Sequence, residues 1–130
     1  SFDIKAFQDS DQDSFLDLKA TVKGKLLPIK MLVSDKQFIS IKAIDKGGIS
    51  YDIKAVTAEG ETLDVKGIAR FGNIVIIKAI TEADVKLDLK GISRSETIAH
   101  VKAINENGDF YGIKAFAPDG TLNDVKGINQ

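Results

Sequence analysis

Hydrophobic and polar residues alternate along most of the chain, and the alternation repeats every twelve residues. A lysine marks each repeat, an aliphatic residue precedes it, and Ala or Gly follows it in every repeat except at Met31. β-Branched residues are frequent and the helical period of about 3.6 residues is absent, so each repeat predicts a strand. Eleven of the sixteen lysines are in this phase: Lys5, Lys19, Lys30, Lys42, Lys54, Lys66, Lys78, Lys90, Lys102, Lys114 and Lys126.

The connections between repeats carry turn residues at a fixed place. Gly108 and Gly120 end the sequences 106–108 and 118–120, in which glycine supplies the positive φ of a tight hairpin. Asp84 occupies the same place in another connection, which makes that turn a weaker prediction. The regular spacing predicts an all-β fold: an antiparallel up-and-down meander of about eleven strands in a single domain over residues 1–130.

Loop lengths predict the register of neighbouring strands. A three-residue loop at residues 118–120 places Lys114 opposite an aspartate ten residues further along, and the same arithmetic applies to the other hairpins. The first, longer loop keeps this register. The predicted pairs are Lys114–Asp124, Lys54–Asp64, Lys66–Asp52, Lys5–Asp17 and Lys19–Asp3, and His100 is expected between Lys90 and Lys114.

A parallel β-solenoid with one twelve-residue coil per repeat is the alternative architecture. It would stack the in-phase lysines about 4.8 Å apart, with like charges adjacent. The antiparallel meander instead alternates lysine with aspartate, which is favourable by about 0.2–1 kcal/mol per pair. Electrostatics therefore favours the meander.

One face of the predicted sheet carries the aliphatic residues and the small Ala or Gly residues, together with larger ones such as Tyr51 and Leu63. We expect this face to be the core, which predicts a closed or nearly closed barrel. The alternative is an open curled sheet that dimerises to cover its apolar face. Eleven antiparallel strands would leave the first and last parallel, so closure is expected to need a parallel seam or an unpaired strand.

Composition narrows the classes of function. The 130 residues are 43% hydrophobic and 28% charged, as in one globular domain, and Lys+Arg (18) nearly balances Asp+Glu (19). This balance argues against a general nucleic-acid binder, which needs a basic excess. The lack of cysteine excludes disulfides, thiolate zinc sites and cysteine nucleophiles. No apolar run approaches the roughly 18 residues of a membrane-spanning helix.

One segment breaks the repeat with alternating carboxylates, Asp9, Asp11 and Asp13, and Asp17 follows. Ca²⁺ takes six to eight oxygen ligands, which such a loop can supply. The spacing resembles the calcium loops of thrombospondin type 3 repeats, although Ser14 stands where that family has glycine. The resemblance implies a Ca²⁺ site formed by these four aspartates, and the alternative is a solvated acidic hairpin tip.

The lysine series has two interpretations. It is either a regular grid that binds a polyanion or a cross-strand ladder of ion pairs that protects the sheet against misregister. Lys90 and Lys102 stand out because the neighbouring ladder positions hold His100 and Gly112 instead of aspartate. His100 is the only histidine and is expected to be structural. Since the chain has no phosphate-binding loop and no catalytic triad order, no catalytic residue is predicted and the chain is not expected to be an enzyme.

The segments 107–112 and 119–121 resemble hairpin-repeat families such as the MORN and YD repeats. The resemblance implies architecture, and scaffolding or surface display by analogy. We therefore predict a non-catalytic binding or structural module of a bacterial extracytoplasmic protein, extracellular or periplasmic, with a protein or polysaccharide partner, as monomer or homodimer. The alternative is a ligand-carrying β-barrel or barrel-lumen enzyme. A polar cavity would favour the alternative, and a lumen filled with aliphatic side chains would favour the module.

Overall fold

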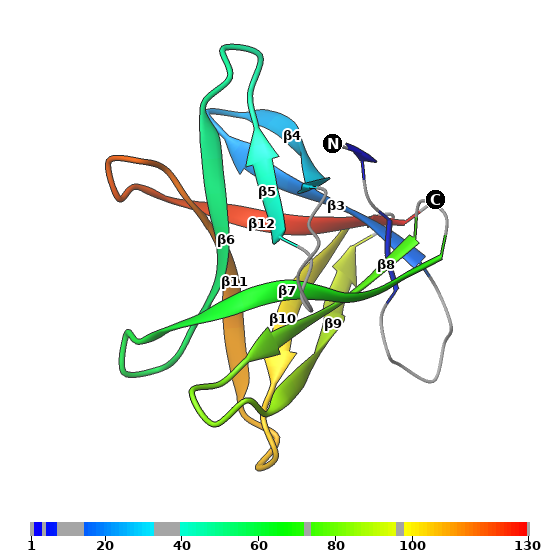
Figure 1. Cartoon of the computed structure of the whole chain (residues 1–130), viewed down its shortest axis with the longest axis vertical. Helices are drawn as coiled ribbons and strands as arrows, with labels where there is room; N and C mark the ends of the chain where they lie inside the picture. The colour runs from blue at the N-terminus through cyan, green and yellow to red at the C-terminus, as the bar shows by residue number, and fades with distance from the viewer. Residues whose placement is uncertain are drawn as a thin grey trace.

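The computed structural model describes residues 2–3, 5–7, 15–32, 40–71, 74–95 and 98–129, which form strands and tight turns in one sheet (Figure 1). In this part of the chain no helix is long and apolar enough to cross a membrane. The strands are β1 (Phe2–Asp3), β2 (Lys5–Phe7), β3 (Phe15–Val22), β4 (Lys25–Leu32), β5 (Ser40–Ile44), β6 (Ser50–Val56), β7 (Thr62–Phe71), β8 (Ile74–Ile80), β9 (Lys86–Ser95), β10 (Ile98–Ile104), β11 (Phe110–Phe116) and β12 (Leu122–Asn129).

Every in-phase lysine lies on a strand of its own. The first repeat is divided, because β1 and β2 lie on either side of residue 4 and together correspond to one predicted strand. From β3 to β12, consecutive strands pair antiparallel. The predicted all-β meander of about eleven strands is thereby confirmed.

The sheet curls into a nearly closed ring of the ten strands β3 to β12. Its ends meet where β12 pairs antiparallel with β3, for example at Val125 and Ala20. In a meander with an even number of strands, the first and last strands run in opposite directions, so β3 and β12 can pair antiparallel. β2 stands apart from this ring order: it pairs antiparallel with β3 and parallel with β8. The expected parallel contact therefore exists, but it joins β2 to β8 and does not close the meander.

The ring is not a regular barrel, because strands exchange partners along their length. In β6, residues 50–52 pair with β5 and residues 54–56 pair with β7, while β11 pairs along residues 52–56. β5 and β7 thus share one edge of β6, and β11 occupies the other. Five of the hairpins, β5–β6, β6–β7, β8–β9, β10–β11 and β11–β12, are paired over only three residues on each strand before their strands diverge. A sheet can close into a ring only if neighbouring strands are offset along their length, and a uniform hairpin register gives no such offset. The exchange of partners supplies it.

The hydrophobic core lies on the predicted face. Wherever the structure describes their side chains, the aliphatic residue before each lysine and the small residue after it are buried. Tyr51 and Leu87 are also buried, and Leu63 and Tyr111 pack against the core. The buried hydrophobic residues are Leu18, Ala20, Ile29, Ile41, Ala43, Tyr51, Ile53, Ala55, Val65, Ile77, Ala79, Leu87, Leu89, Val101, Ala103, Ile113, Ala115 and Val125.

The tight turns follow the sequence signals. Gly108 has φ 84° and donates its N–H to the carbonyl of Asn105, at 3.1 Å. The turn with aspartate at this position forms as well: Asp84 has φ 63°, and its N–H donates to the Thr81 carbonyl at 2.9 Å. The Thr81 hydroxyl also accepts the N–H of Val85. Local hydrogen bonds thus hold this turn in the same conformation without glycine.

The predicted registers are correct near the turns and wrong further away. The three pairs closest to their turns are confirmed, and the two pairs beyond them are replaced, because the strands have exchanged partners by that point. Confirmed are Lys114–Asp124, Lys54–Asp64 and Lys5–Asp17, whereas Asp52 pairs with Lys42 instead of Lys66, and Asp3 with Lys30 instead of Lys19.

Candidate functional site

Tight hairpins bring a lysine and an aspartate ten residues later into contact on the outer face of the sheet. Lys54 Nζ lies 2.6 Å from Asp64 Oδ1, and Lys114 forms the same ion pair at 2.5 Å. Four such pairs occur among the described side chains, and their aspartates are half-exposed, so each pair contributes about 0.2–1 kcal/mol. They are Lys42–Asp52, Lys54–Asp64, Lys78–Asp88 and Lys114–Asp124.

These contacts favour the charged form of the aspartates. The hydrogen bond from Lys54 lowers the pKa of Asp64 against the opposing effect of desolvation, and the charge of Lys66 adds to the shift. The hydrogen bond from Lys114 lowers the pKa of Asp124 in the same way. Lysines beyond the direct partner therefore influence each carboxylate.

Across five other strand pairs, lysine stands opposite lysine. The predicted alternation of lysine with aspartate is wrong there, because these strands pair with whole repeats in phase. The sequence carries a signal for the difference. Where a lysine's strand pairs in phase with the next strand, the residue ten positions after that lysine is not aspartate but Ser40, Ile76 or His100. The Cα partners are Lys19–Lys126, Lys30–Lys42, Lys54–Lys114, Lys66–Lys78 and Lys90–Lys102.

These five lysine pairs differ in how far carboxylates neutralise them. In three pairs at least one lysine forms an ion pair with an aspartate. In the part of the chain that the structure describes, Lys102 and Lys19 have neither a hydrogen bond nor an ion pair, although each faces another lysine. Among the described side chains, Lys102 and Lys19 therefore lack the neighbouring carboxylate that neutralises at least one lysine of each of the other three pairs.

His100 lies between these two pairs, which corrects the predicted position. Its Cα partners are Ile92 and Lys126, because β9 and β10 pair in phase and β10 also contacts β12. Lys126 Nζ donates to His100 Nδ1 at 2.9 Å. The prediction that Lys102 faces Gly112 instead of an aspartate is confirmed.

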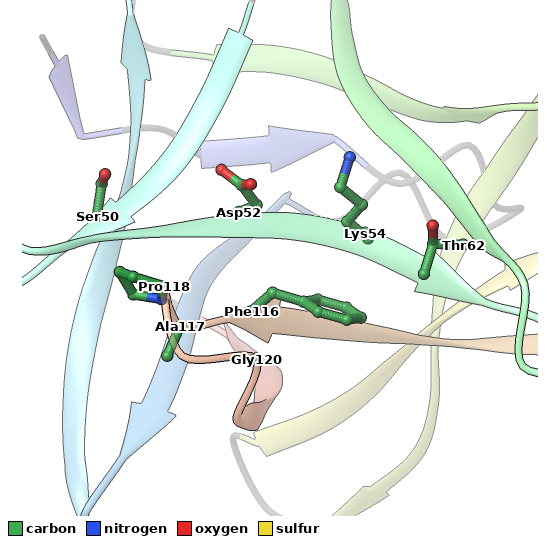
Figure 2. Close-up of a pocket in the computed structure, with 8 residues that line it drawn as sticks. All are labelled: Ser50, Asp52, Lys54, Thr62, Phe116, Ala117, Pro118 and Gly120. Carbon is green, nitrogen blue, oxygen red and sulfur yellow. The ribbon is translucent and has the colours of Figure 1, made fainter.

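An open depression of about 420 Å³ lies on the outer face where β6 meets the β11–β12 hairpin. Figure 2 shows Ser50, Asp52 and Lys54 projecting from β6 to the same side, with the ring of Phe116 on β11 beside them. Thr62 completes a set of hydroxyl, carboxylate, ammonium and aromatic groups. Sequence reasoning did not find this depression, since it depends on the long-range pairing of β6 with β11.

A second depression, of about 400 Å³, lies where three hairpin tips meet. The tips at residues 57–61, 81–85 and 105–107 line it together with Leu63, Leu87 and Tyr111. Its rim carries glutamates instead of lysines: Glu59, Glu61, Glu82 and Glu106. Glutamates thus gather at these hairpin tips, while the in-phase lysines and their aspartate partners lie on the strands.

The predicted calcium ligands Asp9, Asp11 and Asp13 lie outside the described residues. The backbone of Asp17 lies on β3, opposite Lys5 and Ile128. Within the described ranges no group of three or more acidic or histidine side chains is arranged to hold a metal ion. The calcium site stays a prediction.

The profile of DUF7486, described as a family of unknown function, matches residues 1–84 and again residues 74–130. The chain belongs to the DUF7486 family. The two matches together span the chain, so this DUF7486 member matches the profile twice, in keeping with its internal repetition. No curated protein and no solved structure matches the chain.

Proposed function

We propose that this DUF7486 member is a non-catalytic binding module whose outer face binds an acidic polysaccharide. The observation that carries the proposal is the set of five cross-strand lysine pairs. Like charges directly opposite each other destabilise a sheet. Aspartates offset this cost in three of the pairs, and a bound polyanion would offset it along the whole series. A regular series of ammonium groups suits a polymer with regularly spaced carboxylates.

The composition of the interior favours ligand binding on the outer face over catalysis or ligand carriage inside a lumen. Aliphatic and alanine side chains fill the core, and most of the described inward-facing residues of the repeat are apolar, although Asn123, opposite Ala115, is polar and half-buried. A polar lumen is what a ligand-carrying barrel or a barrel-lumen enzyme would require. Binding chemistry is therefore assigned to the outer face.

The depression beside β6 favours a saccharide as the repeating unit. Ser50, Thr62 and Asp52 offer hydrogen-bonding groups to sugar hydroxyls, and Phe116 offers an apolar face to a sugar ring. Lys54 offers a positive charge to a carboxylate. A nucleic acid would call for several stacking aromatics along one groove, and this depression has one. Acidic polysaccharides of this kind belong outside the cytoplasm, so we place the domain in a bacterial extracellular or periplasmic protein.

The test compares retention of the chain on polygalacturonate and on neutral dextran by affinity gel electrophoresis. We expect retention on polygalacturonate only, with a steep decrease as salt rises. The double variant Lys19→Gln/Lys66→Gln, which changes two lysine pairs, should bind severalfold more weakly. The matched control Lys23→Gln/Lys46→Gln removes the same charge from two turns and should bind like the parent chain.

Two results would overturn the proposal. One is equal mobility of the parent chain in polygalacturonate and dextran, which would leave the lysines as a structural ladder. The other is an equal loss of binding in the strand variant and the turn variant, because total charge and not the lysine pairs would then govern binding.

A further inference from the structure

The sheet contains two equivalent three-strand junctions, sixty residues apart in the sequence. In each, a central strand pairs with two neighbours along one edge. The two central strands, β6 and β11, pair with each other along their other edges. The first junction contains Lys42, Lys54 and Lys66 on β5, β6 and β7, and the second contains Lys102, Lys114 and Lys126 on β10, β11 and β12.

The two junctions differ in their carboxylates. In the first, Asp52 and Asp64 each form an ion pair with a lysine, so three lysines and two aspartates leave a formal charge of +1. In the second, Asp124 is the only aspartate at the equivalent positions, and three lysines leave a formal charge of +2. Gly112 stands at the position that corresponds to Asp52.

The missing side chain lies beside an uncompensated ammonium group. Gly112 is the Cα partner of Lys102, as Asp52 is of Lys42. A Cβ built on Gly112 would lie 3.7 Å from Lys102 Nζ and 3.7 Å from Lys114 Cε. This is ordinary contact distance, so the space next to the Lys102 ammonium is open to a small group. Lys102 has no ion pair or hydrogen bond in the described part of the chain.

We propose that the second junction is a carboxylate-binding subsite, in which the acidic group of a uronic-acid residue lies over Gly112 and contacts Lys102. The subsite deepens the proposed function and rests on it for the identity of the ligand. Lys126, held 2.9 Å from the ring nitrogen of His100, lies on the adjoining strand and adds positive charge. The ligand carboxylate would take the role that Asp52 takes beside Lys42 in the first junction.

The test uses sodium galacturonate as probe, with galactose and an equal concentration of sodium chloride as controls. Two-dimensional NMR follows the backbone amide of Gly112 and the imidazole protons of His100. We expect saturable shifts of both with galacturonate and none with galactose. Gly112→Asp supplies an internal carboxylate and should abolish the saturable shift at His100. Gly112→Ala, whose Cβ fits at ordinary contact distance, should retain binding.

A matched variant turns the first junction into a copy of the second. Asp52→Gly removes the carboxylate beside Lys42, so the amide of residue 52 should show a larger saturable response to galacturonate than it does in the parent chain. A response of His100 that persists unchanged in Gly112→Asp would overturn the subsite. Equal shifts with galacturonate and sodium chloride would overturn it as well.

The monosaccharide test separates this subsite from the wider function. Saturable galacturonate binding in a chain that is not retained on polygalacturonate would support the subsite and contradict the proposed function. Retention on the polymer that is unchanged in Gly112→Asp, together with no saturable binding of the monosaccharide, would contradict the subsite and support the function.

Discussion

Lys54 lies directly opposite Lys114 where β6 pairs with β11, and each lysine forms an ion pair with an aspartate on its far side. The sheet therefore carries the row Asp64–Lys54–Lys114–Asp124 across four strands. The two inner ammonium groups are each compensated from outside, which reduces the cost of placing them together. The rows through Lys102 and Lys19 lack such flanking carboxylates among the described residues, and they are where an external anion has most to offer.

The first prediction compares two charge reversals. Lys114→Glu removes the ion pair with Asp124 and replaces it by a like-charge contact, although the new carboxylate also faces Lys54. Lys66→Glu places a carboxylate opposite Lys78 and relieves a like-charge pair. Lys114→Glu should therefore cost more stability, by about 0.5 kcal/mol. Urea denaturation midpoints of the two variants measure the difference. The reverse order would indicate that Lys66 faces an aspartate after all.

A second prediction concerns pH. Because contacts in the folded state lower the pKa of Asp64 and Asp124, their stabilisation is fully present above the unfolded-state pKa of about 3.9. It is lost as pH falls through the lower folded-state pKa. Both carboxylates are half exposed, so each contributes only about 0.2–1 kcal/mol. Asp64→Asn should be less stable than the parent near neutral pH and equally stable once the aspartates are protonated. A constant difference across the whole range would contradict this assignment.

How far the sequence predicts this fold depends on the distance from a turn. The alternation of side chains predicts the buried face correctly, because a strand offers only two faces. A tight turn predicts the register of the three residues next to it, as at Lys54 and Asp64. It cannot predict where β6 leaves β5 for β7, since that exchange depends on the pairing of β6 with β11 some sixty residues away.

The candidate site was predictable only in part, for the same reason. Gly112 beside Lys102 follows from a turn register, and the structure bears it out. The lysine pairs require strands to pair with their repeats in phase, which in β7–β8 and β9–β10 goes together with a register shift within the pair. This pairing also displaced His100 from its expected neighbours. The depression around Phe116 requires two distant strands to lie side by side. Local sequence patterns carry no information on such contacts.

The third prediction tests the packing of the small residues. Ala55 is completely buried, and its Cα partners are Leu63 and Ile113. Ala55→Leu adds volume where no space remains, so it should lower the free energy of unfolding by about 1–3 kcal/mol. The control Ala58→Leu lies in the exposed turn that follows β6 and should change stability by no more than about 0.5 kcal/mol. Similar denaturation midpoints for both variants would contradict the inward orientation of residue 55.

The fourth prediction concerns the turn between β8 and β9. Asp84 adopts φ 63°, a region that is strained for most residues and freely available to glycine. Asp84→Gly should therefore raise the melting temperature, by an amount equivalent to at most about 1 kcal/mol. Gly108→Ala is the complementary variant: its φ is 84°, and it should lose a similar amount although a Cβ there meets no atom within 4 Å. A lower melting temperature for Asp84→Gly would mean that the side chain of Asp84 stabilises the turn more than its backbone conformation strains it.

The last prediction isolates the charge at Gly112 without any ligand. Gly112→Asp supplies the carboxylate that the repeat lacks there, within reach of Lys102, and it also removes a glycine from the interior of β11. Both effects stabilise the fold, by about 0.5–1 kcal/mol for the glycine and about 0.2–1 kcal/mol for the ion pair. Gly112→Asn gains only the first, so the difference in unfolding free energy between the two variants measures the ion pair. That difference should disappear as the pH falls below about 4, because the new carboxylate then becomes protonated. If Gly112→Asp were no more stable than Gly112→Asn at neutral pH, Lys102 would already be compensated in the free protein, and an external carboxylate would gain nothing by binding beside it.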